Sequence, residues 1–477
     1  MGLAAYYFFS STEALGGHNG LGGLPAIDLL GLRLESAAAM SYLLWVAVGG
    51  ALLLARNLLD SRSGRAIRTL RGRAMMAESF GIDTGRYRLV LFVLAAGLAS
   101  VSGWLYAHLV RFVNPTPFGL DAGITYLFMA VVGGTAQAWG AVAGAGLMTV
   151  ALQWLRDLLP RLIGQPGNFE VIVFGVLLVV VMQRTGAGIA DVVGRRVVRA
   201  SREGSGPGAE IVALPTRFPA NAGPLLSVRE VSKRFGGLLA VSRMSLEVGA
   251  GEIVGLMGPN GAGKSTTFAM ISGLLRADGG SIRFRGREIG GMRPRRIVRL
   301  GIARSFQHAL LVPGMSVLGN AAVGAHGRGR CGVLRAALRL DRDEERRLRA
   351  IAEHQLGRLG LAGRLHDPAG SLPLGQQRVL EIARALCAEP LLLLLDEPAA
   401  GLRHHEKQAL AAVLRTLREA GLGILVVEHD MDFLMNLADR VVVMDAGALI
   451  ADGTPDAVRR DPAVLAAYLG GVDDWAA

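Results

Sequence analysis

Lysine is almost absent from this chain of 477 residues, although the chain carries 51 lysine and arginine residues in total. Lysine occurs only at positions 233, 264 and 407, so nearly all positive charge comes from arginine. Charged residues make up only 19% of the sequence and hydrophobic residues 51%, with a mean hydropathy of +0.39. This balance is unusual for a wholly soluble protein and predicts a membrane portion.

Cysteine is also scarce, because only Cys331 and Cys387 are present. Their spacing fits no metal site, and we expect them in a reduced, cytosolic setting. Residues 1–10 carry no basic residue before their apolar run, which is not the pattern of a signal peptide.

The formal net charge of +12 admits two interpretations. A basic protein can bind nucleic acid, or its arginines can flank membrane spans on the cytoplasmic side. The arginines cluster beside apolar runs, which favours the second interpretation. We therefore expect membrane lipid rather than nucleic acid as a partner.

The composition changes along the chain. Residues 1–184 are apolar and rich in glycine and alanine, whereas residues 225–470 alternate strand-like and helix-like patterns with abundant charge. Between them, residues 185–224 contain glycine- and proline-rich stretches typical of a flexible linker, and residues 471–477 form a short tail. We predict an all-α polytopic membrane domain fused to an α/β domain.

About five apolar segments in the first part are candidate spans, although the last three are shorter than a straight span requires. They are Ser36–Ala55, Leu89–Leu109, Ala122–Ala136, Gly140–Leu155 and Phe169–Met182. The pair Gly133-Gly134 either breaks one apolar run, giving two helices with a tight turn or a broken helix, or lies in a loop. Gly140 and Gly144 form a G-x-x-x-G pattern that permits close helix approach. Eight arginines between residues 56 and 88 predict that this loop is cytoplasmic.

One short loop carries the strongest chemical signal. It fits G-x-x-x-x-G-K-[ST], whose backbone N–H groups and following helix N-terminus hold nucleotide phosphates. One of only three lysines stands where this pattern needs one, and the following serine can ligate Mg²⁺. The residues are Gly258, Pro259, Asn260, Gly261, Ala262, Gly263, Lys264, Ser265 and Thr266. A buried strand at Ile253–Met257 and a helix at Ser265–Leu275 are expected on either side.

The second motif is the acidic pair Asp396-Glu397. It follows a run of five leucines, Leu391–Leu395, which is typical of a buried parallel strand. Catalytic groups of open α/β sheets lie at the carboxyl ends of such strands. Asp396 is therefore a candidate Mg²⁺ ligand, and Glu397 is a candidate for polarising the attacking water.

The stretch Ser371–Arg378 resembles the signature of ABC-type ATPases through Leu372, Gly375 and Gln376, although Pro373 and Leu374 depart from the usual residues. The resemblance implies a P-loop ATPase domain with a helical subdomain, in which this element closes over ATP bound to a second ATPase subunit. The following residues also fall in the family's order: Phe235 as the adenine-stacking aromatic, Gln307 as a contact to Mg²⁺ and water, His429 as a γ-phosphate contact, and Arg403 where aspartate or asparagine is usual.

Several further motifs narrow the resemblance to the importers of branched-chain amino acids. Arg234–Leu238, Gly301–Gln307 and the tail residues Tyr468–Gly470 look like their ATPase subunit. Gly16–Leu21 and Tyr106–His108 look like their permease, and Ala77–Ile82 resembles the coupling loop that docks on an ATPase. A plain interfacial helix is the alternative for that loop. The permease resemblance begins partway, so we expect N-terminal helices of the family to be missing.

This resemblance implies ATP-driven uptake of branched-chain or related amino acids across the inner membrane, with the ATPase domain in the cytoplasm. ATP and Mg²⁺ are the implied cofactors. A second ATPase, a second permease and an extracytoplasmic amino-acid-binding protein are the implied partners. The alternatives are an importer of another small amino acid or amide, an exporter, and a membrane-tethered ATPase with a degenerate permease.

Overall fold

A computed structural model describes residues 2–29, 31–70, 74–134, 138–163, 175, 183, 223–306 and 310–469. The chain divides into two compact units, and the division does not follow the sequence in order. The first unit comprises Met1–Leu58 and Leu89–Pro207, and the second comprises Leu59–Arg88 and Gly208–Ala477. A segment of the apolar half therefore belongs to the second unit.

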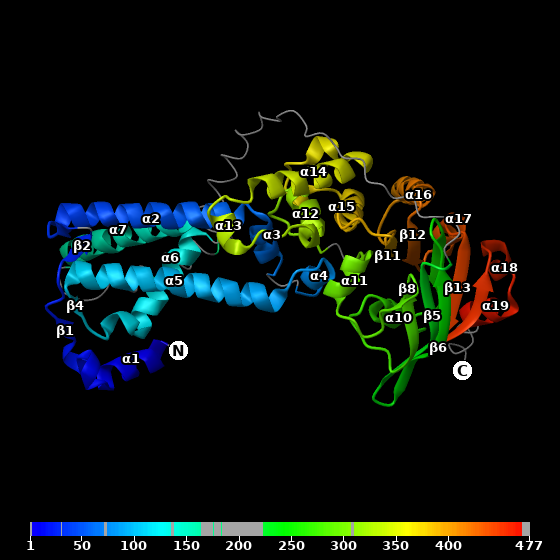
Figure 1. Ribbon diagram of the computed structural model, residues 1–477, viewed down its shortest axis with the longest axis horizontal. Coiled ribbons are helices and arrows are strands. Elements are labelled where there is room, and N and C mark those ends of the chain that lie inside the picture. Colours follow the sequence, from blue (N-terminus) through cyan, green and yellow to red (C-terminus); the bar gives the residue numbers. More distant parts are fainter. Residues whose placement is uncertain are drawn as a thin grey trace. The chain divides into compact units, whose positions relative to one another are not determined.

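The first unit is helical (Figure 1). Three described helices are long and apolar enough to cross a membrane, within α2 (Ala37–Leu59), α5 (Thr84–Val110) and α7 (Ala138–Ile163). The predicted span Ala122–Ala136 corresponds to the shorter α6 (Leu120–Gly133), and the predicted span Phe169–Met182 lies outside the described residues apart from residue 175. The remaining elements are α1 (Gly2–Ser11), β1 (Leu21–Gly22), β2 (Ile27–Leu29), β3 (Leu32–Leu34), β4 (Phe112–Val113), η1 (Glu13–Leu15), η2 (Gly17–Asn19) and η3 (Thr116–Phe118).

Helices α6 and α7 pack closely through glycine. A Cβ atom at Gly133 would overlap the carbonyl oxygen of Gly140, and one at Gly144 would overlap the carbonyl oxygen of Met129. The prediction of a close helix approach at Gly140 and Gly144 is confirmed, because the backbones meet where side chains are absent.

The second unit is built around a six-stranded sheet in the order β10-β11-β12-β7-β13-β14. All neighbours in it run parallel except β13 and β14, and buried residues fill the central strands. Its strands are β7 (Ile253–Met257), β10 (Ile302–Arg304), β11 (Leu392–Asp396), β12 (Gly423–Val427), β13 (Arg440–Asp445) and β14 (Ala448–Gly453). An antiparallel sheet, β6-β5-β8-β9, accompanies it, with β5 (Leu226–Phe235), β6 (Leu238–Val248), β8 (Gly279–Phe284) and β9 (Arg287–Glu288).

Helices of the second unit fall into two groups. Helices α12 (Val317–Gly324), α14 (Arg342–Arg358) and α15 (Leu374–Leu386) pack together in a helical lobe (Figure 1). The others are α10 (Lys264–Ile271), α11 (Pro294–Leu300), α13 (Val333–Ala337), α16 (His404–Glu419), α17 (Met431–Leu437), α18 (Pro455–Arg459) and α19 (Pro462–Leu469), with η4 (Ala325–Arg328), η5 (Ala362–Arg364) and η6 (Ala369–Ser371).

Helices α3 (Arg62–Thr69) and α4 (Ala74–Ser79) come from the apolar half of the sequence but pack within the second unit. Met76, Phe80 and Ile82 are at most 1% exposed, and they share one hydrophobic cluster with strand β7 and helix α15. The guanidinium carbon of Arg384 lies 4.9 Å from the centre of the Phe80 ring. The segment that resembles a coupling loop is therefore part of the core around the large sheet.

Candidate functional site

Three loops meet at the carboxyl edge of the large sheet. Strands β7, β12 and β11 are neighbours, with Leu256 paired to Val427 and Val427 paired to Asp396. The loop that begins at Gly258 follows β7, Glu397 follows β11, and His429 comes two residues after β12. The carboxyl ends of parallel strands lie at one edge of the sheet. Residues more than 130 positions apart in the sequence, such as Lys264 and Glu397, are therefore brought to the same edge.

The loop at Gly258–Thr266 is shaped by close backbone contacts. Gly258 has φ +150°, and a Cβ atom there would overlap the carbonyl oxygen of Met444. Gly263 has φ +96°, and a Cβ atom there would overlap the carbonyl oxygen of Ala240. Only glycine fits both places, so the loop follows a path that other residues would block.

Lys264 is the first residue of α10, and it is 5% exposed. Its Nζ donates to the carbonyl oxygens of Gly258 at 2.6 Å and Pro259 at 2.8 Å. Burial lowers the pKa of the Lys264 ammonium, while the carboxylates of Glu397 and Asp396 act in the opposite direction. A buried cation at a helix N-terminus, surrounded by a glycine loop, fits a phosphate group.

Glu397 and His429 are in direct contact. His429 Nε2 lies 2.7 Å from Glu397 Oε1. The Glu397 backbone has φ +47°, which is uncommon for a non-glycine residue, and its N–H donates to the carbonyl oxygen of Val427 at 2.9 Å. Strain of this kind is held in place by surrounding structure and is concentrated at functional sites.

Asp396 makes a buried ion pair that sequence reasoning missed. Its Oδ2 lies 3.0 Å from Nη2 of Arg304, and the two side chains are 7% and 10% exposed. The Asp396 backbone N–H also donates to the Ser305 hydroxyl at 3.3 Å. Arg304 lies within the Gly301–Gln307 motif that the sequence singled out. An arginine in that motif was the one sequence feature that could have pointed to this ion pair.

A buried glutamate supports the loop after β11. Glu428 Oε1 accepts a hydrogen bond from the backbone N–H of Ala399 at 2.6 Å, and burial raises the pKa of this carboxyl. The neighbouring Asp430 pairs with Lys407 of α16 at 2.5 Å. The Arg403 backbone N–H donates to Glu406 Oε2 at 2.9 Å, and Arg403 is the N-cap residue of α16. The arginine that replaces the usual aspartate or asparagine of the family therefore stands at the start of this helix.

The remaining predicted residues have different surroundings. Phe235 ends strand β5 and is 46% exposed, as a residue that stacks on a ligand requires. Leu372 is buried, and Gly375 and Gln376 lie in the first turn of α15, whose N-cap is Pro373. Among the described residues, Gln376 Oε1 finds no hydrogen-bond partner although it is covered. Gln307 lies outside the described residues.

The C-terminal helix reaches the glycine loop. Burial raises the pKa of the Tyr468 hydroxyl, and the backbone N–H of Gly258, within hydrogen-bond reach of that hydroxyl, opposes the shift. Tyr468 also packs against the core that contains β7. The tail motif that suggested a particular family is therefore a structural neighbour of the predicted phosphate loop.

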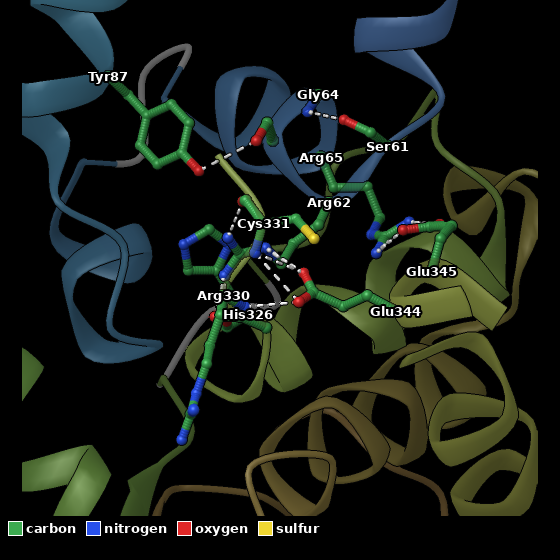
Figure 2. A network of polar contacts seen from close by, with 12 residues as sticks. Ser61, Arg62, Gly64, Arg65, Tyr87, His326, Arg330, Cys331, Glu344 and Glu345 are labelled. Atoms are coloured by element: carbon green, nitrogen blue, oxygen red, sulfur yellow. Dashed lines mark hydrogen bonds and ion pairs between the residues drawn. The ribbon is translucent and has the colours of Figure 1, made fainter. Parts of the chain in front are cut away.

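The segment Leu59–Arg88, called the docked segment below, is held by a second polar cluster (Figure 2). Arg62 donates to three backbone carbonyls, those of His326, Gly329 and Cys331, at 2.8, 2.7 and 2.5 Å. Arg65 forms a two-pronged ion pair with Glu345, whose second bond, from Nη2 to Oε2, is 3.0 Å long. This cluster connects α3 to helix α14 and to the loop before it.

Three protein families match parts of this chain. Residues 241–400 match the ABC transporter family, residues 3–182 match the permease component of the branched-chain amino acid transport system, and residues 448–474 match the branched-chain amino acid ATP-binding cassette transporter family.

Curated relatives match the second part. The branched-chain amino acid transport ATP-binding protein LivG of Salmonella typhimurium is 41% identical over 250 residues, which are 52% of this chain and 98% of LivG. BraF of Pseudomonas aeruginosa is 41% identical over the same shares of both chains. A solved nucleotide-free ATP-binding cassette from an ABC transporter is 30% identical, with a TM-score of 0.47, over 51% of this chain and 98% of that chain.

The fold and the matched families define an ABC-type ATPase fused to a helical membrane permease. The chain belongs to the branched-chain amino acid transport family of ABC transporters. The predicted fold class is confirmed, and the chain binds nucleotide and couples ATP hydrolysis to transport.

Proposed function

We propose that this chain imports branched-chain or related hydrophobic amino acids across the inner membrane. The proposal is supported by the convergence of the glycine loop, Glu397 and His429 at one sheet edge, in a chain that also carries the matched permease region. The relatives' printed names supply the substrate class. An extracytoplasmic binding protein would deliver the amino acid.

The proposed roles follow from position. Residues 258–266 would hold the phosphates, with Lys264 turning from its backbone carbonyls toward the β- and γ-phosphates. Phe235 would stack on the adenine, and His429 would contact the γ-phosphate. Glu397 would accept a hydrogen bond from the attacking water and orient it in line with the bond that breaks.

Mg²⁺ would be held by Ser265 and Asp396, together with Gln307, a contact expected from the sequence. The Arg304 ion pair engages Oδ2 of Asp396, so the ion would use the other carboxylate oxygen. A hydroxyl and a carboxylate are the hard oxygen ligands that Mg²⁺ prefers, and the cation would neutralise phosphate charge.

Each site would be completed by a second ATPase domain. Leu372, Gly375 and Gln376 lie at the N-terminal end of α15, where a positive helix end favours phosphate oxygens of a nucleotide bound to the partner. Closing two ATPase domains would move the docked segment Leu59–Arg88 with the second unit, and this movement would open the membrane path to one side.

The test is Glu397→Gln in proteoliposomes that contain the purified complex and binding protein. We expect ATP binding to persist, and both hydrolysis and leucine uptake to fall at least about 100-fold. Transport that continued at the wild-type rate would overturn the assignment of Glu397. Hydrolysis that ignored leucine-loaded binding protein in the wild type would overturn the importer.

A further inference from the structure

An exposed apolar and basic segment precedes helix α14. In residues 330–342, Leu334, Leu338 and Leu340 are 74%, 60% and 67% exposed. Leu334 and Leu338 are four residues apart at helical spacing and lie on one face. On the opposite face, the smaller side chains of Val333, Ala336 and Ala337 pack inward. The larger leucine side chains therefore face outward.

The charges of this segment are sorted by sign. Arg330, Arg335, Arg339 and Arg342 are exposed. The acids that follow, Glu344 and Glu345, turn inward to Arg62 and Arg65 (Figure 2), Asp341 is buried, and the exposed Asp343 pairs with Arg346. The outer surface of the segment is thus leucine and arginine.

The segment is held firmly in this position. Arg62 binds the carbonyl oxygens of Gly329 and Cys331, while Glu344 accepts hydrogen bonds from the backbone N–H groups of Arg330 at 2.6 Å and Cys331 at 3.0 Å. Helix α13 also packs on α3. The leucines are therefore exposed on an ordered, fixed surface.

This surface lies close to a membrane span along the chain. Arg62 comes three residues after Leu59, the last residue of the apolar helix α2. Three residues reach at most about 11 Å when fully extended. Since Arg62 binds the carbonyl oxygens of Gly329 and Cys331 directly, the chain connection keeps this part of the segment within reach of Leu59.

We propose that residues 330–342 bind the surface of an anionic lipid bilayer. Leucines at helical spacing beside arginines are the composition of an interfacial helix, in which apolar side chains enter the acyl boundary and arginines contact lipid phosphates. The contact would fix the helical lobe against the bilayer through Arg62 and Glu344. It goes beyond the transport function and depends only on the membrane location of the chain.

The experiment uses the full chain with Cys331→Ser and Leu338→Cys, labelled with bimane and reconstituted in phosphatidylglycerol-containing vesicles. Cys387 is fully buried and will not react. We expect a nitroxide placed near the headgroup end of the lipid acyl chain to reduce the emission about twofold or more. The matched control is Leu465→Cys on α19, an exposed leucine at 46%, which should keep its emission.

A further variant separates lipid from protein as the occupant. Arg335→Gln with Arg339→Gln should weaken the quenching at Leu338→Cys in phosphatidylglycerol vesicles toward its level in phosphatidylcholine vesicles. Equal emission at Leu338→Cys and Leu465→Cys would overturn the proposal. Protection of Leu338→Cys from aqueous iodide without quenching by the lipid nitroxide would also overturn it, because a protein partner would then cover the segment.

Discussion

Arg304 holds Asp396 in a buried ion pair, with 3.0 Å between Nη2 and Oδ2. The same guanidinium donates to the Ser272 hydroxyl at 2.9 Å, and its carbon lies 5.7 and 5.6 Å from the ring centres of Phe268 and Phe306. One arginine therefore joins the end of β10 to the end of β11 and to the C-terminal end of α10.

Replacing Arg304 with methionine should leave the Asp396 carboxylate buried without its partner. Breaking a buried pair costs about 3 kcal/mol, so the ATPase part should unfold at a clearly lower temperature, which calorimetry can measure. Arg304→Lys should lose less because it keeps the charge.

The control for Arg304 is Arg283→Gln. Arg283 pairs with Glu288 at 3.6 Å, and both side chains are about half exposed. Exposed pairs contribute about 0–1 kcal/mol, so this change should barely move the transition. If Arg304→Met and Arg283→Gln had equal effects, the buried pair would not be a stabilising contact.

His429→Ala should reduce ATP hydrolysis about 100-fold while nucleotide binding stays nearly unchanged. The imidazole contacts Glu397 at 2.7 Å, so its loss removes a group that orients the glutamate, together with the proposed phosphate contact. A fluorescent ATP analogue and a phosphate-release assay measure the two quantities. His366→Ala, an exposed histidine of the helical lobe, is the control, and comparable losses from both changes would count against a specific role.

Two glycines of the proposed phosphate loop should differ in their tolerance of alanine. At Gly258 a methyl group would overlap the Met444 carbonyl, so Gly258→Ala should abolish ATP binding or prevent folding. At Gly261, with φ +84°, no atom lies within 4 Å of the added Cβ, and only a backbone cost of about 1–2 kcal/mol applies. Thermal shift with and without ATP distinguishes them, and equal damage at both positions would contradict the steric argument.

The Arg65–Glu345 pair should make docking of α3 sensitive to acid. Burial opposes ionisation of Glu345, but hydrogen bonds and charge from Arg65 and Arg349 together outweigh it and hold the pKa of this carboxyl below its ordinary value. A depressed pKa stabilises the folded state above the unfolded value, about 4.3 for glutamate, and this stabilisation disappears as pH falls through the folded pKa. Unfolding temperatures measured from pH 7 to pH 3 should show this loss.

The double variant Arg65→Gln with Glu345→Gln should remove that part of the acid sensitivity. Arg65→Gln alone should destabilise the unit at neutral pH, because Glu345 is only 14% exposed. Arg243→Gln is the control, since Arg243 and Glu230 are mostly exposed. An unchanged pH profile in the double variant would rule out this pair as the origin.

Sequence patterns predicted the parts of the site whose spacing is local. The strand Ile253–Met257 appears with those bounds, because a buried apolar run fixes them. Helix α10 ends at Ile271, four residues before the predicted end, since Ser272 and Gly273 close it. The Arg304–Asp396 pair could not be predicted, because it joins residues 92 positions apart through strand pairing.

The burial of Met76, Phe80 and Ile82 among residues of the ATPase part has a consequence for biosynthesis. The ribosome makes this segment well before β5, the first strand of the ATPase part, which begins at Leu226. The segment therefore stays without its packing partners until they have been synthesised. The last core contacts of the ATPase part therefore close over a long loop in the chain. Expression of residues 223–477 alone would expose the apolar side chains that Met76, Phe80 and Ile82 cover, and such a fragment should aggregate unless residues 59–88 are supplied as a separate peptide.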